Sequence, residues 1–350
     1  MTRPFAPGPR NTITDVPGIL VGHAQDMAVM SGVTVVSAPD RAVAAVDVRG
    51  GGPGTRETDA LSADCLVDAA DAVVLAGGSV YGLEAASGVA AWLGARGRGF
   101  ELASSPVTAP IVPAAILFDL ANGGDKAWGE MPPYRDLGIA AIAAAGEDVA
   151  LGNAGAGLGA CAGSLKGGIG SASVTAPGGV MIGAVVAVNS FGSAVMPGSA
   201  RLWAAPFELA GELGGQDRLP LPSPLPADPY TDTKIDASPG MNTTIGVIAT
   251  DAELTPAEAR RLAIMAQDGY ARAIRPIHTP FDGDIVFALA TGKRALAAEV
   301  PRASALAVLG ALAADTMARA VARGVYGARG AGGVESYRDR FGQKISGTIT

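Results

Sequence analysis

The chain has 350 residues, of which 49% are hydrophobic and 5% aromatic, and it carries 49 glycines and a formal net charge of −7 at pH 7. This length and apolar content suffice for a large core of small, tightly packed side chains, so an intrinsically disordered chain is excluded. Nucleic-acid binding is also excluded, because it requires a clustered basic face and the Lys and Arg residues of this acidic chain are scattered.

The beginning of the chain, MTRPFAPGPRNTITDVPG, lacks the apolar stretch that forms the centre of a secretory signal. Elsewhere no apolar run approaches the roughly 18 residues that a membrane-spanning helix requires. The two cysteines, Cys65 and Cys161, lie far apart without metal-ligand spacing, so neither a disulfide framework nor a zinc site is predicted. These features predict a soluble, cytoplasmic protein without a membrane partner.

Short runs rich in β-branched residues predict strands, and segments of helical period predict helices between them. The strand runs are mostly continuously apolar, which is typical of strands covered on both faces. Because strands and helices mix without strict alternation, the pattern predicts a layered α/β sandwich rather than a doubly wound sheet. The strands are predicted at 43–48, 72–76, 179–188, 244–250 and 284–290, and the helices at 82–95, 256–272 and 302–323.

The second predicted helix has the clearest start signal. Thr255 suits the N-cap, Pro256 the first helical position and Glu258 the third, which together make a capping box. The proline-rich segment 214–240, which precedes this part of the chain, is predicted to be an exposed linker, because alternating prolines cannot join a central strand. The residues after it complete the same sheet system, so 1–350 is predicted to form a single α/β domain.

A glycine-rich turn, GGSVYGLEAASGV from Gly77, follows the predicted strand at 72–76 and leads into a helix. Its backbone N–H groups are able to face a bound carbonyl or carboxylate, which makes Ser79 and Tyr81 candidates for lining a substrate pocket. Ordinary strand-to-helix turn chemistry explains the same residues, so both interpretations stay open.

Residues 155–160 satisfy the loose dinucleotide pattern G-x-G-x-x-[GA]. Such a site also needs an acidic residue about 20 positions later, yet no Asp or Glu occurs from 149 through 207. Close backbone packing is therefore favoured, and no cofactor is predicted. Within the same acid-free stretch, Lys166 is either a surface lysine or a cation placed to bind an oxyanion or to lower a neighbouring pKa.

Thr243 and Thr244 stand at the start of the predicted strand at 244–250. A mid-chain threonine hydroxyl is a poor nucleophile, and the sequence offers no obvious Ser-His-Asp or Cys-His set to activate one. Cleavage of the Asn242–Thr243 bond gives Thr243 a free α-amine, with a reference pKa of about 7.7 to 8.0, beside its own hydroxyl. One residue then supplies both base and nucleophile. A structural threonine in a strand is the alternative.

Further polar residues are candidates for the same chemistry. Asp282 and Asp284, in PFDGDIVFA, precede an apolar strand and point to one face if the strand reaches them, where they are able to orient the ammonium and the hydroxyl. Asn189, at the end of GAVVAVN, has an amide suited to an oxyanion. A solvated Asp-Gly turn and a turn asparagine are the alternatives. No metal is predicted, because His23 and His278 are the only imidazoles.

Seven segments, in this order, resemble the DmpA-type or P1-family peptidases, which are self-processing N-terminal-nucleophile amide hydrolases. This family includes L-aminopeptidase/D-esterases, β-peptidyl aminopeptidases and nylon-oligomer endo-hydrolases. The resemblance covers most of the chain and implies a four-layered αββα sandwich. The segments are ITDVPGILVGHA, VRGGGPGTRETD, LAGGSVYGLEAASGV, GNAGAGLGACAGSLKGGIGSAS, AVVAVNSFG, NTTIGVIATDAELT and FDGDIVFALATG.

The resemblance also implies that the precursor cuts itself and that its two parts, an α chain 1–242 and a β chain 243–350, stay associated in a homo-oligomer of processed protomers. Thr243 matches the nucleophile, and Asn242 matches the residue before the cut. Asn189 matches the oxyanion-side asparagine. Lys166 matches the lysine of the K-G-G loop.

The residues at the cut and in the acidic pair resemble one branch of the family. Asp282 and Asp284 match the acidic pair of the nylon-oligomer hydrolases, and Asn-Thr matches their cleavage site. The aminopeptidase branch has Ser after Gly at the cut and a Ser-x-Glu in place of Asp-x-Asp. Strict aminopeptidase activity is therefore in doubt.

The predicted function is a self-cleaving amide hydrolase that forms an acyl-enzyme on an N-terminal Thr without a cofactor or metal. The substrate class, whether α-peptide, β-peptide, ω-amino-acid oligomer or ester, stays open. Two functions of other classes remain as alternatives. One is a noncatalytic small-molecule binding protein on the same fold, and the other is a dinucleotide-dependent oxidoreductase that uses the loop at 155–160.

Overall fold

The computed structural model describes residues 5–216, 219–225, 228–235 and 242–346. Within these residues the longer helices are α1 (Glu84–Gly94), α2 (Tyr134–Ala143), α3 (Pro256–Ala273), α4 (Arg302–Gly327) and α5 (Tyr337–Ser346). The strands are β1 (Leu20–Asp26), β2 (Ser31–Val48), β3 (Thr55–Arg56), β4 (Ala69–Ala76), β5 (Ala114–Ile116), β6 (Cys161–Ala162), β7 (Leu165–Lys166), β8 (Gly168–Thr175), β9 (Met181–Asn189), β10 (Thr243–Ala252) and β11 (Ile285–Arg294).

One mixed sheet runs through the described residues in the order β3-β5-β4-β2-β11-β10-β9-β8, and β1 pairs with β2 beside this path. Its strand pairs are antiparallel except β4 with β5 and β10 with β11. The long strand β2 pairs with β1 through its first half and with β11 through its second half. Its register against β4 shifts between Ser37 and Ala42, where the strand is irregular. Strand β2 therefore belongs to both layers of the sheet, with its first half in one and its second half in the other.

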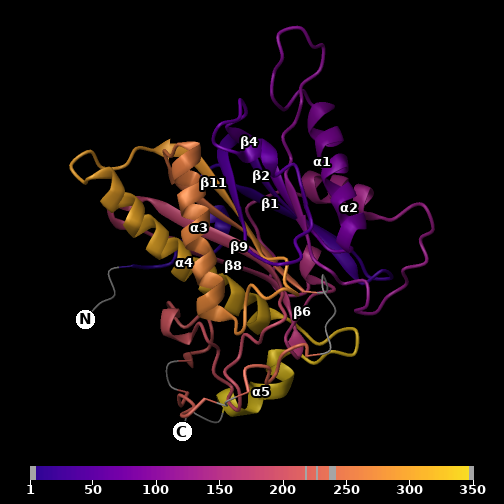
Figure 1. Ribbon diagram of the computed structural model, residues 1–350, viewed down its shortest axis with the longest axis vertical. Helices are drawn as coiled ribbons and strands as arrows, with labels where there is room; N and C mark the ends of the chain where they lie inside the picture. Colours follow the sequence, from indigo (N-terminus) through magenta and orange to yellow (C-terminus); the bar gives the residue numbers. More distant parts are fainter. Residues whose placement is uncertain (1–4, 217–218, 226–227, 236–241, 347–350) are drawn as a thin grey trace.

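Three apolar cores separate four layers. Helices α1 and α2 cover the outer face of the part built on β2, β4 and β5, and helices α3 and α4 cover the outer face of β8 to β11. Between the two parts of the sheet lies a third core, in which Leu75 faces Val247 and Phe287, all 0% exposed. The two helix pairs flank the sheet on opposite sides in Figure 1. The predicted αββα sandwich is therefore confirmed.

All five predicted strands and all three predicted helices are present in the structure. The cap of α3 is also as predicted: the Glu258 N–H donates to Thr255 Oγ1 at 3.3 Å, and the Thr255 N–H donates to Glu258 Oε2 at 2.9 Å. The strand at 43–48 is the end of the much longer β2. Strands and helices from both sides of position 243 build the same sheet and cores.

Helix α4 is long and apolar enough to cross a membrane by length and composition alone, but 72% of its most apolar 18-residue stretch is buried inside the fold. It packs against α3, β8 and β9. Helix α4 is therefore the central helix of a packed core, which explains its composition without a lipid environment.

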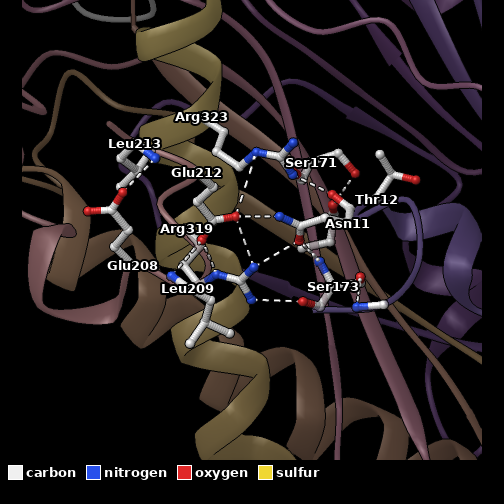
Figure 2. Close-up of polar contacts among 12 residues, drawn as sticks. Asn11, Thr12, Ser171, Ser173, Glu208, Leu209, Glu212, Leu213, Arg319 and Arg323 are labelled. Atoms are coloured by element: carbon white, nitrogen blue, oxygen red, sulfur yellow. Dashed lines mark hydrogen bonds and ion pairs between the residues drawn. The ribbon is translucent and has the colours of Figure 1, made fainter. Parts of the chain in front are cut away.

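A buried ionic cluster ties α4 to two distant segments (Figure 2). Arg319 is 1% exposed and donates to both carboxylate oxygens of Glu212, at 2.5 and 2.9 Å. Its other N–H groups donate to the Ser173 carbonyl and to Asn11 Oδ1, each at 2.8 Å. Burial disfavours the ionised form of Glu212, but hydrogen bonds and charge from Arg319 outweigh it and hold the pKa of this carboxyl below its ordinary value.

The predicted linker 214–240 is described only in part, since 217–218, 226–227 and 236–240 lie outside the described residues. Leu221 is 64% exposed and Leu225 is 36% exposed, as expected of a surface segment. Near its end the segment returns to the fold, where the Lys234 N–H donates to the Phe191 carbonyl at 3.1 Å.

Candidate active site

Three strand ends meet at one edge of the sheet. Asn189 is the last residue of β9, and Thr243, the first residue of β10, lies directly opposite it in the antiparallel ladder. Because β11 runs parallel to β10, its start at Ile285 reaches the same edge. The topology thus brings together four of the predicted site residues, and all are at most 2% exposed: Asn189, Thr243, Asp282 and Asp284.

The carbonyl of Asn242 receives two hydrogen bonds. The Thr243 hydroxyl donates to Asn242 O at 2.5 Å, and the Gly283 N–H donates to the same oxygen at 2.9 Å. The nucleophile candidate therefore lies against the peptide group that precedes it. A backbone N–H on a carbonyl oxygen also stabilises the negative charge that forms there when the carbon is attacked.

Gly283 and Gly50 allow this close packing. A Cβ atom on Gly283 lies 2.9 Å from Thr243 Oγ1 and 2.7 Å from the Gly52 carbonyl oxygen, and a Cβ atom on Gly50 lies 2.2 Å from Asp284 N. The Gly52 N–H donates to the Asp282 carbonyl at 2.7 Å, which fastens the glycine-rich segment after β2 over the turn. Side chains at these positions collide with backbone, so glycine is required there.

Asp282 is a fully buried carboxyl group with several donors. Its Oδ2 accepts the Thr279 N–H at 3.0 Å and the Thr279 hydroxyl at 2.6 Å, and its Oδ1 accepts the Phe191 N–H at 3.1 Å. Burial raises the pKa of Asp282, and the neighbouring Asp284 raises it further. The carboxyl fixes the turn beside Thr243, so it is not part of a solvated loop.

Asp284 joins β10 to the imidazole of His278, for which the sequence predicted no role. Its Oδ1 accepts the Thr244 N–H at 2.8 Å, and its Oδ2 accepts the His278 N–H at 3.1 Å and lies 2.9 Å from His278 Nδ1. These contacts hold the backbone next to Thr243 against β11. The set of donors around each carboxyl explains how two buried acids are accommodated one residue apart.

The Asn189 amide is oriented by groups from three different segments. Its Oδ1 accepts the Cys161 N–H at 2.9 Å and lies 3.1 Å from Lys234 Nζ, and its Nδ2 donates to the Phe118 carbonyl at 3.0 Å. Side chains of directly opposed residues in an antiparallel pair share one face of the sheet. The Asn189 amide therefore lies on the same face as the Thr243 hydroxyl.

Lys166 lies on the β6–β7 hairpin, paired with Cys161, rather than on the protein surface. Its ammonium donates to the carbonyls of Gly157, Ala160 and Gly167, at 2.9, 2.7 and 2.8 Å. Burial lowers the pKa of Lys166 to about 8. The three N–H groups of the Lys166 ammonium are thus used by backbone carbonyls. Lys166 is connected to Asn189 indirectly, through its hairpin partner Cys161, whose N–H donates to the Asn189 amide.

The side chain of Asn242 is unusual. The residue is 0% exposed, and neither its amide nitrogen nor its amide oxygen has a hydrogen-bond partner in the described structure. The hydroxyl of Thr244 is likewise buried and unpartnered. Buried polar groups in folded proteins are normally hydrogen-bonded, so the residues on both sides of Thr243 carry unsatisfied groups.

Comparison with known proteins identifies the chain. Residues 11–338 match the profile of "Peptidase family S58". The chain belongs to peptidase family S58. Two relatives support the assignment. An uncharacterized aminopeptidase of Mycobacterium tuberculosis (strain ATCC 25618 / H37Rv) is 48% identical over 347 residues, covering 95% of this chain and 98% of the relative. A 6-aminohexanoate-oligomer endohydrolase of Kocuria sp. (strain KY2) is 32% identical over 290 residues, covering 79% and 74%.

Two solved structures share the S58 fold. A Burkholderia sp. beta-aminopeptidase matches with a TM-score of 0.67 at 24% identity, covering 98% of this chain and 94% of its own. The L-aminopeptidase D-Ala-esterase/amidase of Ochrobactrum anthropi, a variant of the Ntn-hydrolase fold, matches with a TM-score of 0.67 at 21% identity, covering 99% and 96%. The resemblance to DmpA-type peptidases is confirmed, and membership of S58 makes the chain an amide-bond hydrolase.

Two further predicted residues of this S58 chain lie on the turn after β4. Ser79 has a left-handed backbone (φ 52°), and the ring of Tyr81, which is 45% exposed, makes an edge contact with Trp128 at 5.6 Å. Within the turn, the Gly78 N–H donates to the buried carboxyl of Asp119 at 2.7 Å. The Gly78 N–H, one of the backbone groups considered for binding a ligand, is thus hydrogen-bonded to a side chain of the same protein. This contact favours the interpretation of the segment as an ordinary turn.

The loop at 155–160 does not open a helix of the S58 fold. Gly155–Gly157 form a single 3-10 turn, and the Ala156 N–H donates to Thr34 Oγ1 at 3.2 Å. The loop packs closely against β2, so a dinucleotide-dependent oxidoreductase is not favoured. In the described part of the chain, no group of three or more His, Cys, Asp or Glu side chains is arranged to hold a metal ion.

Sequence reasoning missed three groups around Thr243: the Gly283 N–H, the His278 imidazole and the Lys234 ammonium. The Gly283 N–H is a backbone group that almost every residue type has, so the sequence does not indicate its role. The rarity of lysine could have drawn attention to Lys234, because only 5 of the 26 Lys and Arg residues are lysines. Two of these five, Lys166 and Lys234, lie around Asn189.

Proposed function

We propose that this S58 peptidase cuts its own chain between Asn242 and Thr243 and that Thr243 then acts as an N-terminal nucleophile on amide substrates. One observation carries the proposal. The Thr243 hydroxyl and the Gly283 N–H both lie on the carbonyl oxygen of Asn242, at 2.5 and 2.9 Å. The attacking group and a donor for the oxyanion thus meet at the same peptide bond.

The first acyl transfer is internal. Thr243 Oγ forms a bond to the Asn242 carbonyl carbon, the peptide C–N bond breaks, and the hydroxyl proton passes to the departing nitrogen of Thr243. The product is an ester between Asn242 and the Thr243 side chain. Water then hydrolyses the ester, which leaves a carboxylate on Asn242 and frees the Thr243 hydroxyl beside the amine that the shift released.

The second acyl transfer uses the new amine as a base. An α-amine has a reference pKa of about 7.7 to 8.0, so roughly a tenth to a sixth of it is neutral at pH 7 and able to take the hydroxyl proton. Thr243 Oγ then attacks the substrate carbonyl, the proton passes to the leaving amine, and water releases the acyl group. Asn189 lies on the nucleophile's face and is our candidate for the oxyanion donor.

The buried acids have positioning roles in this proposal. Asp284 holds the Thr244 N–H at 2.8 Å and thereby fixes the backbone on which the nucleophile stands. Asp282 fixes the turn that presents the Gly283 N–H to the Asn242 carbonyl. Lys166 is proposed to support Asn189 through the β6–β7 hairpin.

For the substrate, we propose short oligomers of amino acids linked by amide bonds, as in the names of the aminopeptidase and 6-aminohexanoate-oligomer relatives. We also propose that processed protomers assemble into a homo-oligomer in the cytoplasm. The cysteines support a reducing compartment, because both Cys65 and Cys161 are free thiols.

Intact-mass measurement of the purified protein tests self-cleavage. The expected result is two chains, with TTIGVI as the N-terminal sequence of the smaller one. A panel of amides with free and blocked amino ends then separates exo from endo cleavage. A single intact chain without amide hydrolysis contradicts the proposal and favours a noncatalytic binding protein on this fold.

Gly283→Ala is expected to slow self-cleavage about tenfold or more. The new Cβ atom lies 2.9 Å from Thr243 Oγ1, so the hydroxyl or the turn must move away from the Asn242 carbonyl. The rate is measured as conversion of newly synthesised precursor into two bands. Gly94→Ala is the control, because its Cβ atom meets nothing closer than 3.7 Å and it lies in α1. Equal conversion rates for both variants contradict this role of the turn.

A further inference from the structure

The segment just before the cut docks on the active site. The Lys234 N–H donates to the Phe191 carbonyl, and the Ser164 N–H donates to the Asp232 carbonyl, each at 3.1 Å. The ring of Tyr230 makes an edge contact with the ring of Phe191 at 6.2 Å. Residues 230–234 are therefore held by backbone and aromatic contacts to the chain that follows β9 and to the β6–β7 hairpin.

This docking brings a cation to Asn189. Lys234 Nζ lies 3.1 Å from Asn189 Oδ1 and 3.3 Å from the Asn189 carbonyl oxygen. Since Asn189 directly opposes Thr243, with Cβ atoms of such pairs about 4.5 to 5.5 Å apart, the ammonium reaches the face on which the nucleophile lies. An ammonium is a donor only, so it adds to the Cys161 N–H in holding the Asn189 amide oxygen on this side.

We propose that Lys234 is a positioning residue for self-cleavage, which orients the Asn189 amide from the segment that the cut separates from the nucleophile. The inference rests on the proposed cleavage before Thr243. Lys234 is suited to this because its backbone is anchored at Phe191, two residues after Asn189. The amide then presents its nitrogen side consistently while the Asn242 carbonyl is attacked.

The charges around Lys234 come from three segments. Burial lowers the pKa of Lys234 to about 8, while Cys161 on the hairpin and Asp282 on the turn favour its charged form. Lys166, on the same hairpin as Cys161, opposes it, as the two ammonium groups repel. The hydrogen bond from Lys234 to Asn189 is therefore charge-assisted below about pH 8. It weakens as the pH rises above this value, because a neutral amine holds the amide oxygen less strongly.

The experiment compares Lys234→Met, Lys234→Arg and the wild type in a pulse-chase of newly synthesised full-length chain, with the two product bands as readout. Removing a charge-assisted hydrogen bond is expected to slow cleavage by Lys234→Met on the order of tenfold at pH 7, while Lys234→Arg keeps most of the rate. Lys293→Met is the control, because that ammonium pairs with the exposed Asp40 at 3.1 Å.

The pH profile separates positioning from a merely structural role. A guanidinium stays charged, so the ratio of the Lys234→Arg rate to the wild-type rate is expected to rise above pH 8. A Lys234→Met chain that cleaves at the wild-type rate, or a rate ratio for Lys234→Arg that stays flat from pH 6 to pH 9, overturns the inference.

These outcomes are distinct from a failure of the proposed function. If the wild type itself remains one chain, self-cleavage is wrong. If the wild type is cut and the Lys234 variants are cut equally fast, only the role of Lys234 is wrong. Thermal melting of each variant reports folding, and if Lys234→Met does not fold, the pH comparison of Lys234→Arg with the wild type decides.

Discussion

Thr243→Ala is expected to leave the protein as one uncut chain and to lower amide hydrolysis at least about a thousandfold, in line with removal of the nucleophile in other acyl-transfer enzymes. Alanine removes the hydroxyl that donates to the Asn242 carbonyl, and none of the other described residues offers a hydroxyl to that oxygen. It also removes the proposed base, since no new amine forms without the cut. Denaturing gels, intact mass and hydrolysis of an amide substrate measure the two losses.

Two variants serve as controls. Thr243→Ser keeps a hydroxyl at the site and is expected to be processed. Thr244→Val changes the neighbouring side chain to one of the same shape, and because the Thr244 hydroxyl has no partner, processing is expected at a near-normal rate. Cutting of Thr243→Ala contradicts the mechanism. In that case an α chain lighter by one water points to attack by the Asn242 side chain on its own carbonyl.

Arg319→Met is expected to lower the free energy of unfolding by about 3 to 5 kcal/mol, because it removes the cation that donates to both oxygens of the buried Glu212 carboxylate. Among the described residues, Arg323 at 3.7 Å and the Asn11 amide at 2.5 Å then remain beside that carboxylate. Figure 2 shows how the guanidinium bridges Glu212, Asn11 and Ser173. Urea or thermal unfolding of the Thr243→Ala background, in which the chain stays in one piece, measures this loss.

The exposed pair of α3 and α4 is a matched control. Arg302 donates to Glu258 at 2.7 Å but is 46% exposed, so Arg302→Met is expected to cost less than about 1 kcal/mol. In processed protein Glu212 and Arg319 belong to different chains, so Arg319→Met is also expected to weaken their association in gel filtration. Equal losses for the two arginine variants contradict the role of the buried cluster.

Periodicity predicted eight elements whose apolar side chains line the cores, but it did not predict β1, the first half of β2, β5, α2 or β8. Strand β8, GIGSASVT, consists largely of small residues because α4 lies directly against its backbone. A Cβ atom on Gly170 lies 1.8 Å from the Ala320 carbonyl oxygen. In such a strand, Gly, Ala and Ser take the places where β-branched residues usually stand, because the helix needs room close to the backbone. Strand propensity alone therefore does not reveal it.

The site was predictable where its residues mark strand ends. Asn189, Thr243 and Asp284 stand at the ends of three predicted apolar runs, and the order β11-β10-β9 places those ends at one edge. Lys234 and His278 were not predictable in this way, because irregular segments place them and no repeat or spacing encodes the path of such a segment. The family resemblance indicated which roles to expect for these residues, and the strand order explains why they lie close together.

If the chain is cut as proposed, the amide of Asn242, which has no hydrogen-bond partner among the described residues, favours the cut state. Leaving buried polar groups without partners costs roughly 1 to 3 kcal/mol for each group, and in the described part of the uncut chain this penalty lies at the bond proposed for cleavage. Once Asn242 becomes a chain end, its amide is free to turn toward water. Resealing a bond cut in this way would require the amide nitrogen and oxygen of Asn242 to lose that water again, so the proposed cleavage would be favoured in one direction by the fold.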